Sequence, residues 1–328
     1  MKRRKFILDS IKTSAIISTF GIASCNNISK PRKPEKIISS KSNQDIFKLS
    51  LAQWSIHKQI KNETISPYDF ASIARKWEFE GLEYVSDLYG ISKSKNPNKE
   101  LEKFIKISNE EAKKNNLQNL LIMIDDEGDL STKSKKTRDK AISNHYKWIH
   151  AASAMGCHSI RINLFGSNDP LTWQENSKES LKTLCEYAAP YKINILVENH
   201  GRLSSNASLL IEVITDVDLP NCGTLPDFGN FCLSRDYGRI DSDCTESYDK
   251  YKGIDELLPK AFAVSAKSYD FNKDGHETSI DYERMLQMVK DSGYKGFIGV
   301  EYEGDRLSEK EGSIATKNLI LKSIKNLI

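Results

Sequence analysis

The feature that most constrains the fold of this chain is a repeated alternation of short apolar runs with longer amphipathic runs. The apolar runs are FKLSLAQWSI (47–56), GLEYVSD (81–87), LQNLLIMIDD (117–126), CHSIRINLFG (157–166), INILVENHG (193–201), CGTLPDFGN (222–230), AFAVSAKSYDF (261–271) and FIGVEYEG (297–304). Short runs rich in Ile, Val and Leu are typical of buried parallel strands, and the segments between them have helical spacing of apolar residues. Eight strand–helix units in about 280 residues favour an α/β fold, a single-domain (β/α)8 TIM barrel, over an open sheet.

The first 24 residues differ in composition from the rest. A basic start and a short apolar run precede Cys25, which is the order of a secretory signal peptide. The apolar run is too short and too broken to cross a bilayer. RRKFI resembles a twin-arginine export signal, and IASC resembles a bacterial lipobox. We expect residues 1–24 to be a signal peptide and Cys25 to be lipidated. Residues 25–45 would then be a flexible tether, and residues 46–328 the barrel domain. The alternative is an ordinary cleaved signal or a disordered basic tail.

The mature chain predicted in this way is nearly neutral. The full sequence has 48 Lys and Arg against 45 Asp and Glu; without the first 24 residues the counts are 43 and 44. A net charge of −1 offers no general electrostatic attraction for nucleic acid. We therefore expect an exported protein, periplasmic or membrane-anchored, that meets the membrane only through its lipid anchor and does not bind nucleic acid.

Five cysteines follow Cys25, and no C-x-x-C spacing occurs among them. This argues against a zinc ribbon or a thiol-redox motif. An oxidising compartment would allow one disulfide, for which Cys232 and Cys244 are the first choice. We expect most of the cysteines to be small buried residues.

Polar side chains stand at the ends of three of the predicted strands, at Glu198, Asp227 and Glu301. The catalytic face of such a barrel lies at the carboxyl ends of its strands, and alternation points every second side chain inward. The three carboxylates should therefore converge. Like charges repel strongly in a site of low dielectric constant, so a cation must lie among them or some of them must keep their protons.

These strand ends resemble the xylose-isomerase-like sugar isomerase/epimerase barrels, a family that also includes endonuclease-IV-type relatives. The resemblance covers about residues 47–325 and is carried by ILVENHG, GTLPDFGN, AVSAKSYDF and GYKGFIGVEYEG. In that family Glu, Asp, His and Glu on the fifth to eighth strands hold one divalent metal. The resemblance implies that Glu198, Asp227 and Glu301 are metal ligands.

Two positions depart from the family pattern. Ser265 stands where the metal-binding histidine is expected, and its neutral hydroxyl is a poor replacement for imidazole. Asn230 stands where many relatives have a substrate-binding histidine. Two hypotheses follow. Either the carboxylates, with water or His200, hold Mn2+ or Mg2+, or Lys267 neutralises the carboxylates without a metal.

The residue types suit the transfer of a proton on the carbon next to a carbonyl group. Glu198 and Glu301 are the predicted acid/base pair, and a metal or a lysine would stabilise the oxyanion that develops. The residues expected to bind the carbohydrate are His200, Arg161, Asn163, Asn230, Lys267, His57 and Trp54. Glu83 and Asp125, which end the second and third predicted strands, are further candidates.

The leading hypothesis is thus a sugar isomerase or epimerase acting on a free sugar or a sugar derivative. Keto-glycoside lyase or hydrolase chemistry could begin with the same proton abstraction. A non-catalytic sugar-binding lipoprotein is a further alternative, because the histidine ligand is missing. A trinuclear zinc endonuclease would need several histidines at strand ends, and only His57 and His200 are placed there.

Overall fold

The structure is a computed structural model that describes residues 47–235 and 243–327. The predicted signal peptide, the lipidated Cys25 and the tether lie outside these residues and stay predictions. Within the described part of the chain, none of the helices combines the length and the apolar character that crossing a membrane requires.

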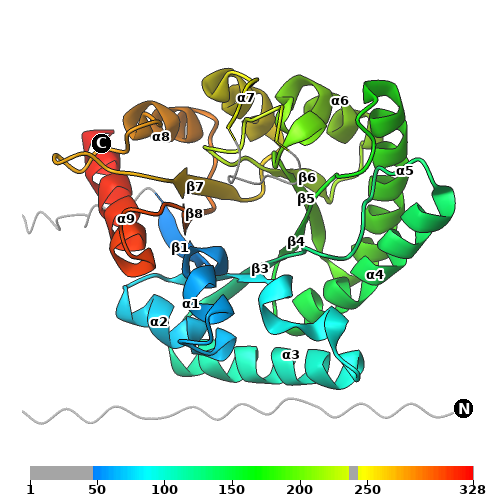
Figure 1. Ribbon diagram of the computed structural model, residues 1–328, viewed down its shortest axis with the longest axis horizontal. Helices are drawn as coiled ribbons and strands as arrows, with labels where there is room; N and C mark the ends of the chain where they lie inside the picture. Colours follow the sequence, from blue (N-terminus) through cyan, green and yellow to red (C-terminus); the bar gives the residue numbers. More distant parts are fainter. Residues whose placement is uncertain (1–46, 236–242, 328) are drawn as a thin grey trace, which may run out of the picture. The chain divides into compact units, whose positions relative to one another are not determined.

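Eight parallel strands form one sheet that curls into a barrel, seen from one end in Figure 1. The strands are β1 (Lys48–Ala52), β2 (Gly81–Val85), β3 (Gln118–Met123), β4 (Ser159–Ile162), β5 (Asn194–Glu198), β6 (Cys222–Leu225), β7 (Val264–Ser268) and β8 (Phe297–Tyr302). They pair in the order β6-β5-β4-β3-β2-β1-β8-β7. Bridges from Thr224 to Ala261 and from Asp227 to Ser265 join the β6 end of the sheet to β7. This closure confirms the predicted (β/α)8 TIM barrel.

Helices connect one strand to the next, and most of them surround the barrel (Figure 1). They are α1 (His57–Lys61), α2 (Phe70–Lys76), α3 (Pro97–Lys114), α4 (Lys135–Ala154), α5 (Pro170–Ala188), α6 (Ala207–Val217), α7 (Lys250–Leu257), α8 (Tyr282–Asp291) and α9 (Glu309–Asn326). Many of them start where the sequence supplies an N-cap side chain, which accepts a backbone N–H that would otherwise be unpaired. These caps are Ser134, Asp169, Asn206, Asp249, Asp281 and Ser308.

Several polar and charged side chains of the strands are buried beside the apolar core, among them Ser50, Glu83, Arg161 and Lys267. Ser50 on β1 donates a 2.5 Å hydrogen bond to Glu83 on β2. Gly299 on β8 leaves room for that carboxyl group, because a Cβ atom there would lie 2.5 Å from Glu83 Oε1. Arg161 on β4 and Lys267 on β7 pair with acids of other strands. The charges inside the barrel therefore extend to its functional end.

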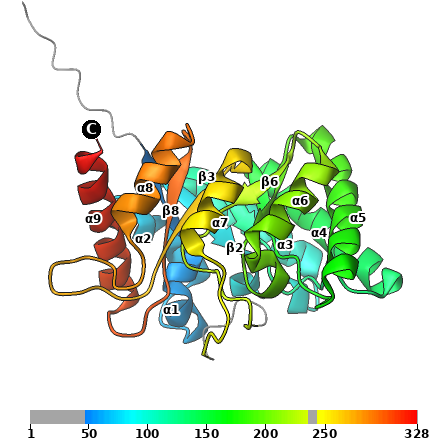
Figure 2. The same cartoon turned by 90° about the horizontal axis from the view of Figure 1, so that it is seen from above.

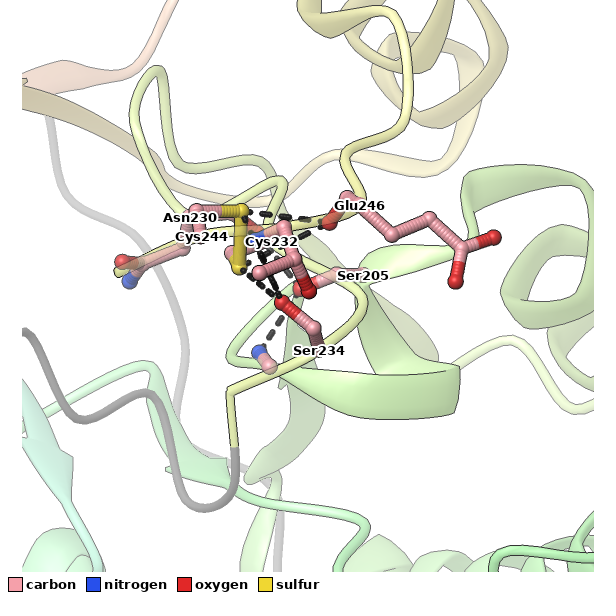
Figure 3. The surroundings of a disulfide bond; sticks show 8 residues. Ser205, Asn230, Cys232, Ser234, Cys244 and Glu246 are labelled. Atoms are coloured by element: carbon pink, nitrogen blue, oxygen red, sulfur yellow. Dashed lines mark hydrogen bonds between the residues drawn. A yellow bond between two sulfur atoms is a disulfide. The ribbon is translucent and has the colours of Figure 1, made fainter. Parts of the chain in front are cut away.

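Helix α1 and the loops that follow β6 and β7 extend beyond the strands on the side where the strands end (Figure 2). The loop after β6 is crossed by a disulfide between Cys232 and Cys244, which confirms the predicted pair. Figure 3 shows Asn230 and Ser205 beside this disulfide, and Ser205 donates a 2.7 Å hydrogen bond to the carbonyl oxygen of Asn230. The remaining cysteines of the described residues are free and buried, as expected: Cys157, Cys185 and Cys222.

Candidate active site

Three carboxylates from neighbouring parts of the sheet meet at the carboxyl ends of the strands. Glu198 ends β5, Asp227 follows β6, and Glu301 lies in β8. One oxygen atom from each lies within 4.8 Å of the other two, and all three side chains are buried. This is the convergence that the alternation in the sequence predicts.

The side of the site formed by β7 and β8 is saturated with hydrogen bonds. Lys267 Nζ lies 2.7 Å from Glu301 Oε1 and 3.0 Å from Glu303 Oε2. Ser265 Oγ lies 2.6 Å from Asp227 Oδ2 and 3.1 Å from Glu301 Oε2. We call Ser265, Lys267, Glu301 and Glu303 the closed wall. Ser265 thus contacts two of the three carboxylates.

Asn199, between two site residues, fixes the loop that carries Asp227. Its Oδ1 accepts the backbone N–H of Asp227 at 2.8 Å, and its Nδ2 donates to the carbonyl oxygens of Asp227 and Asn230. Asp227 Oδ1 accepts the backbone N–H groups of Gly229 and Asn230, and Asn230 Nδ2 donates to Glu198 Oε1 at 2.9 Å. The polar residues at the end of β5 therefore have different roles: Glu198 belongs to the carboxylate cluster, and Asn199 positions the loop that carries Asp227.

The side formed by β3, β4 and β5 contains buried polar atoms without partners. Asp125 Oδ1 accepts hydrogen bonds from Arg161 Nη1 at 3.0 Å and Asn163 Nδ2 at 2.7 Å. Among the described residues, Asn163 Oδ1 and His200 Nδ1 have no hydrogen-bond partner. Arg161 Nε lies 2.8 Å from Glu198 Oε2, but neither atom makes a hydrogen bond of acceptable geometry. We call Asp125, Arg161, Asn163 and His200 the open wall.

Burial of the cluster disfavours its negative charge. It is the main cause that raises the pKa of Glu198 to about 7 and the pKa of Asp227 to about 8. The positive charges of Arg161 and Lys267 act in the opposite direction and are outweighed. Near neutral pH Asp227 therefore mostly keeps its proton, and Glu198 is divided between its two protonation states, unless more positive charge is supplied.

The closed wall keeps opposite charges together despite its burial. Burial would lower the pKa of Lys267, but Glu301 and Glu303 outweigh it and hold that pKa well above its usual range. Burial would likewise raise the pKa of Glu303, but Lys267 and a hydrogen bond from Trp54 hold it below its usual value. The ammonium and the Glu303 carboxylate are therefore charged near neutral pH.

The open wall joins an ionised acid to a neutral imidazole. Burial would raise the pKa of Asp125, but the charge of Arg161, the nearby His200 and the hydrogen bonds from Arg161 and Asn163 together outweigh it, so the pKa is lowered. Burial and, second, the charge of Arg161 lower the pKa of His200 to about 4. The imidazole is thus neutral near pH 7, and Nδ1 is free to donate or accept a hydrogen bond.

A cavity of about 1010 Å³ opens between the two walls. Seven residues proposed from the sequence contribute to its lining: Trp54, His57, Asp125, Arg161, Asn163, His200 and Glu301. The rings of Trp54 and His57 stack with their centroids 4.2 Å apart, and Trp54 Nε1 donates to Glu303 at 2.8 Å. The other proposed residues are buried outside the lining: Glu198, Asp227, Asn230, Ser265 and Lys267. The cavity lies at the upper end of the size range of ligand sites.

Three residues have roles in the site that the sequence analysis did not assign to them. Glu303 lines the cavity and was not among the candidates, although it has the same inward parity as Glu301. Asp125 was a candidate without an assigned role, and the structure places it at the centre of the open wall. Asn199 has the outward parity of a structural residue, and its link to the next strand depends on the fold.

Comparison with known proteins agrees with this geometry. The family model described as "Xylose isomerase-like TIM barrel" matches residues 72–324. The chain belongs to the xylose isomerase-like TIM barrel family. The match covers the strands β2 to β8, and with them the three carboxylates and both walls.

Solved structures of this family share the fold at low sequence identity. The 3-keto-D-glucoside 4-epimerase YcjR of E. coli is 12% identical, with 78% of this chain and 94% of that chain covered and a TM-score of 0.61. The IOLI protein with a bound zinc atom is 13% identical, with 86% and 99% covered and a TM-score of 0.61.

Matches to curated relatives are partial. The C-glycoside deglycosidase alpha subunit of Arthrobacter globiformis is 32% identical over 54 residues, which are 16% of this chain and 15% of that protein. An uncharacterized protein of Methanocaldococcus jannaschii, MJ1311, is 26% identical over 153 residues, which are 44% of this chain and 49% of that protein. The aligned part of this chain thus spans less than half the length of each relative.

Proposed function

We propose that this protein is an enzyme that moves a proton on the carbon next to a carbonyl group of a sugar or sugar derivative, as sugar isomerases and epimerases do. The observation that supports this most is the convergence of three buried carboxylates beside a cavity lined by hydrogen-bonding and aromatic side chains. Isomerisation needs an acid/base group that moves the proton from one carbon to the next, and epimerisation needs a second group that returns the proton on the opposite face, so a pair of carboxyl groups suits both reactions.

Glu301 is the proposed base, because it is the member of the cluster that lines the cavity. Lys267 holds one of its oxygens and Ser265 the other, so its position is fixed before a substrate binds. Glu198 is its proposed partner. Burial raises the pKa of Glu198 to about 7, so this side chain can exist in either protonation state near neutral pH.

A divalent metal fits the residues present. Five carboxylates surround the site, Asp125, Glu198, Asp227, Glu301 and Glu303, against two cationic side chains, Arg161 and Lys267. Glu198 Oε2 lacks a hydrogen bond although it is buried. All-oxygen donors suit Mn2+ or Mg2+. Glu198, Asp227 and Glu301 would hold the ion, which would supply stabilisation of negative charge on a substrate oxygen.

The open wall is the proposed binding surface for the sugar. Asn163, His200 and Arg161 have buried polar atoms without a hydrogen-bond partner among the described residues, and sugar hydroxyl groups can satisfy both donors and acceptors. Trp54 and His57 supply an aromatic edge on the other side of the cavity. Asn230 positions Glu198 rather than lining the cavity.

Keto-glycoside lyase or hydrolase chemistry is the second candidate. The cavity is larger than a single sugar ring requires, and one curated relative is a subunit of a C-glycoside deglycosidase. The first step would be the same proton abstraction, followed by loss of a leaving group instead of reprotonation. Products with a new double bond or a released aglycone would distinguish it from isomerisation.

We further propose that the protein is exported and anchored through Cys25. The signal-like first 24 residues suggest export, and a disulfide between Cys232 and Cys244 is typical of proteins in oxidising compartments. Mass spectrometry of the mature N-terminus tests this proposal. A lipid on Cys25 would support it, and an intact Met1 in the native host would contradict it.

The proposed chemistry is tested by incubating the protein with a panel of ketoses and keto-glycosides in D2O, with and without Mn2+. We expect deuterium at a carbon next to the carbonyl group in at least one compound, and no incorporation by Glu301→Gln. Ligand binding by calorimetry without exchange or product in any compound would instead indicate a sugar-binding protein that has lost its catalytic role.

A further inference from the structure

We infer that Lys267 and Ser265 compete with a divalent cation for the carboxylates of this site, so that the protein binds such ions weakly and reversibly. The inference rests on the metal site of the proposed function and adds how that site is regulated. A histidine ligand would contribute to holding the ion, whereas the residues found here hold the carboxylates in the absence of one.

The contacts of Asp227 and Glu301 support this inference. Asp227 Oδ1 accepts two backbone N–H groups, and its Oδ2 accepts the hydroxyl of Ser265 at 2.6 Å. Glu301 Oε1 accepts a hydrogen bond from Lys267 Nζ at 2.7 Å, and its Oε2 lies 3.1 Å from Ser265 Oγ. The single proton of the Ser265 hydroxyl can go to Asp227 Oδ2 or to Glu301 Oε2, so three of the four oxygens have a donor at any moment. Lys267 Nζ is also 3.9 Å from Asp227 Oδ2, so its charge lies beside the position of an ion.

A cation entering the cluster must therefore displace donors and approach an ammonium group in a buried site. Repulsion between these charges is strong where the dielectric constant is low, which weakens the binding of the ion. Lys267 nevertheless keeps a second partner, because Glu303 Oε2 lies 3.0 Å from Nζ and Glu303 is itself held by Trp54. The ammonium can thus release Glu301 to an ion and remain paired with Glu303.

The test measures the binding of MnCl2 by isothermal titration calorimetry, without any substrate. Lys267→Met replaces the lysine with an unbranched, uncharged side chain that is one heavy atom shorter, and we expect its Kd for Mn2+ to be at least tenfold lower than that of the wild type. Ser265→His removes the competing hydroxyl and adds a ligand, so its Kd should fall by a similar factor.

Lys317→Met is the matched control. Lys317 is also buried and makes an ion pair, with Glu78 at 2.9 Å, and a 2.7 Å hydrogen bond to the carbonyl oxygen of Trp77. Its replacement removes a buried lysine whose partners are Trp77 and Glu78 and not the carboxylate cluster, so Kd for Mn2+ should not change. An equal change in both lysine variants would show a general effect of lost buried charge and would overturn the inference.

Thermal unfolding gives a second readout. Lys267→Met should have a lower Tm than the wild type without ions and a larger rise in Tm when MnCl2 is added. Unchanged or weaker Mn2+ binding by Lys267→Met would contradict the inference. If Lys267→Met does not fold, unchanged Mn2+ binding by Ser265→His would contradict it instead. Tighter ion binding without any deuterium exchange would uphold the inference and refute the proposed chemistry.

Discussion

The closed wall and the open wall face the same cavity but differ in whether their buried polar atoms have hydrogen-bond partners. In the closed wall, Glu301 Oε1 accepts a hydrogen bond from Lys267, and Oε2 lies within hydrogen-bond distance of the Ser265 hydroxyl. In the open wall, Asn163 Oδ1 and His200 Nδ1 lack a hydrogen-bond partner among the described residues. A buried polar atom without a partner costs about 1–3 kcal/mol, which a bound ligand can recover. One wall is thus organised to hold its own groups in place, and the other to receive a ligand.

The largest expected effect concerns the closed wall. Glu301→Gln removes the proposed base, and kcat should fall by about 10²- to 10⁴-fold, the usual contribution of a general base. Glu303→Gln is the matched control, because Glu303 also lines the cavity and also binds Lys267. We expect it to retain more activity. Steady-state kinetics of both variants decide the point, and an equal loss would mean that the two acids act as one unit.

Glu83 shows what happens to a buried acid that belongs to neither wall. Burial is the main cause that raises its pKa from 4.5 to about 7, and the Ser50 hydroxyl is its hydrogen-bond partner. The folded protein therefore binds this proton more tightly than the unfolded chain does. The contribution of Glu83 to stability is greatest below about pH 4.5 and is lost as the pH rises through about 7.

The size of this loss is up to about 3 kcal/mol. Chemical denaturation of the wild type between pH 5 and pH 8 should show a decline in the free energy of unfolding. Glu83→Gln keeps the size of the side chain and cannot ionise, so its decline should be smaller. Parallel curves for the two proteins would show that Glu83 ionises normally in the folded state.

A paired substitution compares the two walls directly. His200→Phe keeps an aromatic ring beside Phe165 and removes the unpaired nitrogen, so KM should rise about tenfold with little change in Tm. Ser265→Ala removes a donor to Asp227 and Glu301, so it should lower Tm in the absence of ions. Kinetics and thermal unfolding of both variants provide the comparison. A marked loss of Tm in His200→Phe would contradict the assignment of that wall to ligand binding.

The smallest effect is expected at the rim of the cavity. Lys93 pairs with Asp87 and Asp126, but its side chain is 68% exposed. Exposed ion pairs contribute about 0–1 kcal/mol and weaken as salt is added. Lys93→Ala should therefore lower the free energy of unfolding by less than about 1 kcal/mol at low salt. A loss as large as that of Lys267→Met would show that exposure does not separate these two lysines.

The sequence was sufficient for the barrel and for the convergence of Glu198, Asp227 and Glu301, because both follow from the periodicity of strands. The same parity would have identified Glu303. The sequence could not predict that Arg161 lies between Asp125 and Glu198, since this contact depends on how three strands curve toward each other. Long side chains reach across the barrel, and their partners are set by distance rather than by spacing along the chain.

The absence of a side chain at Gly299 leads to an evolutionary expectation. Because a methyl group there would collide with the Glu83 carboxyl group, positions 83 and 299 share one volume inside the barrel. In homologous chains the two positions should co-vary, because a bulkier residue at 299 requires a shorter residue at 83. Such a chain would lose the buried carboxyl group at position 83 and the proton that it carries. An alignment in which the two positions change independently would show that the strands shift to absorb the difference.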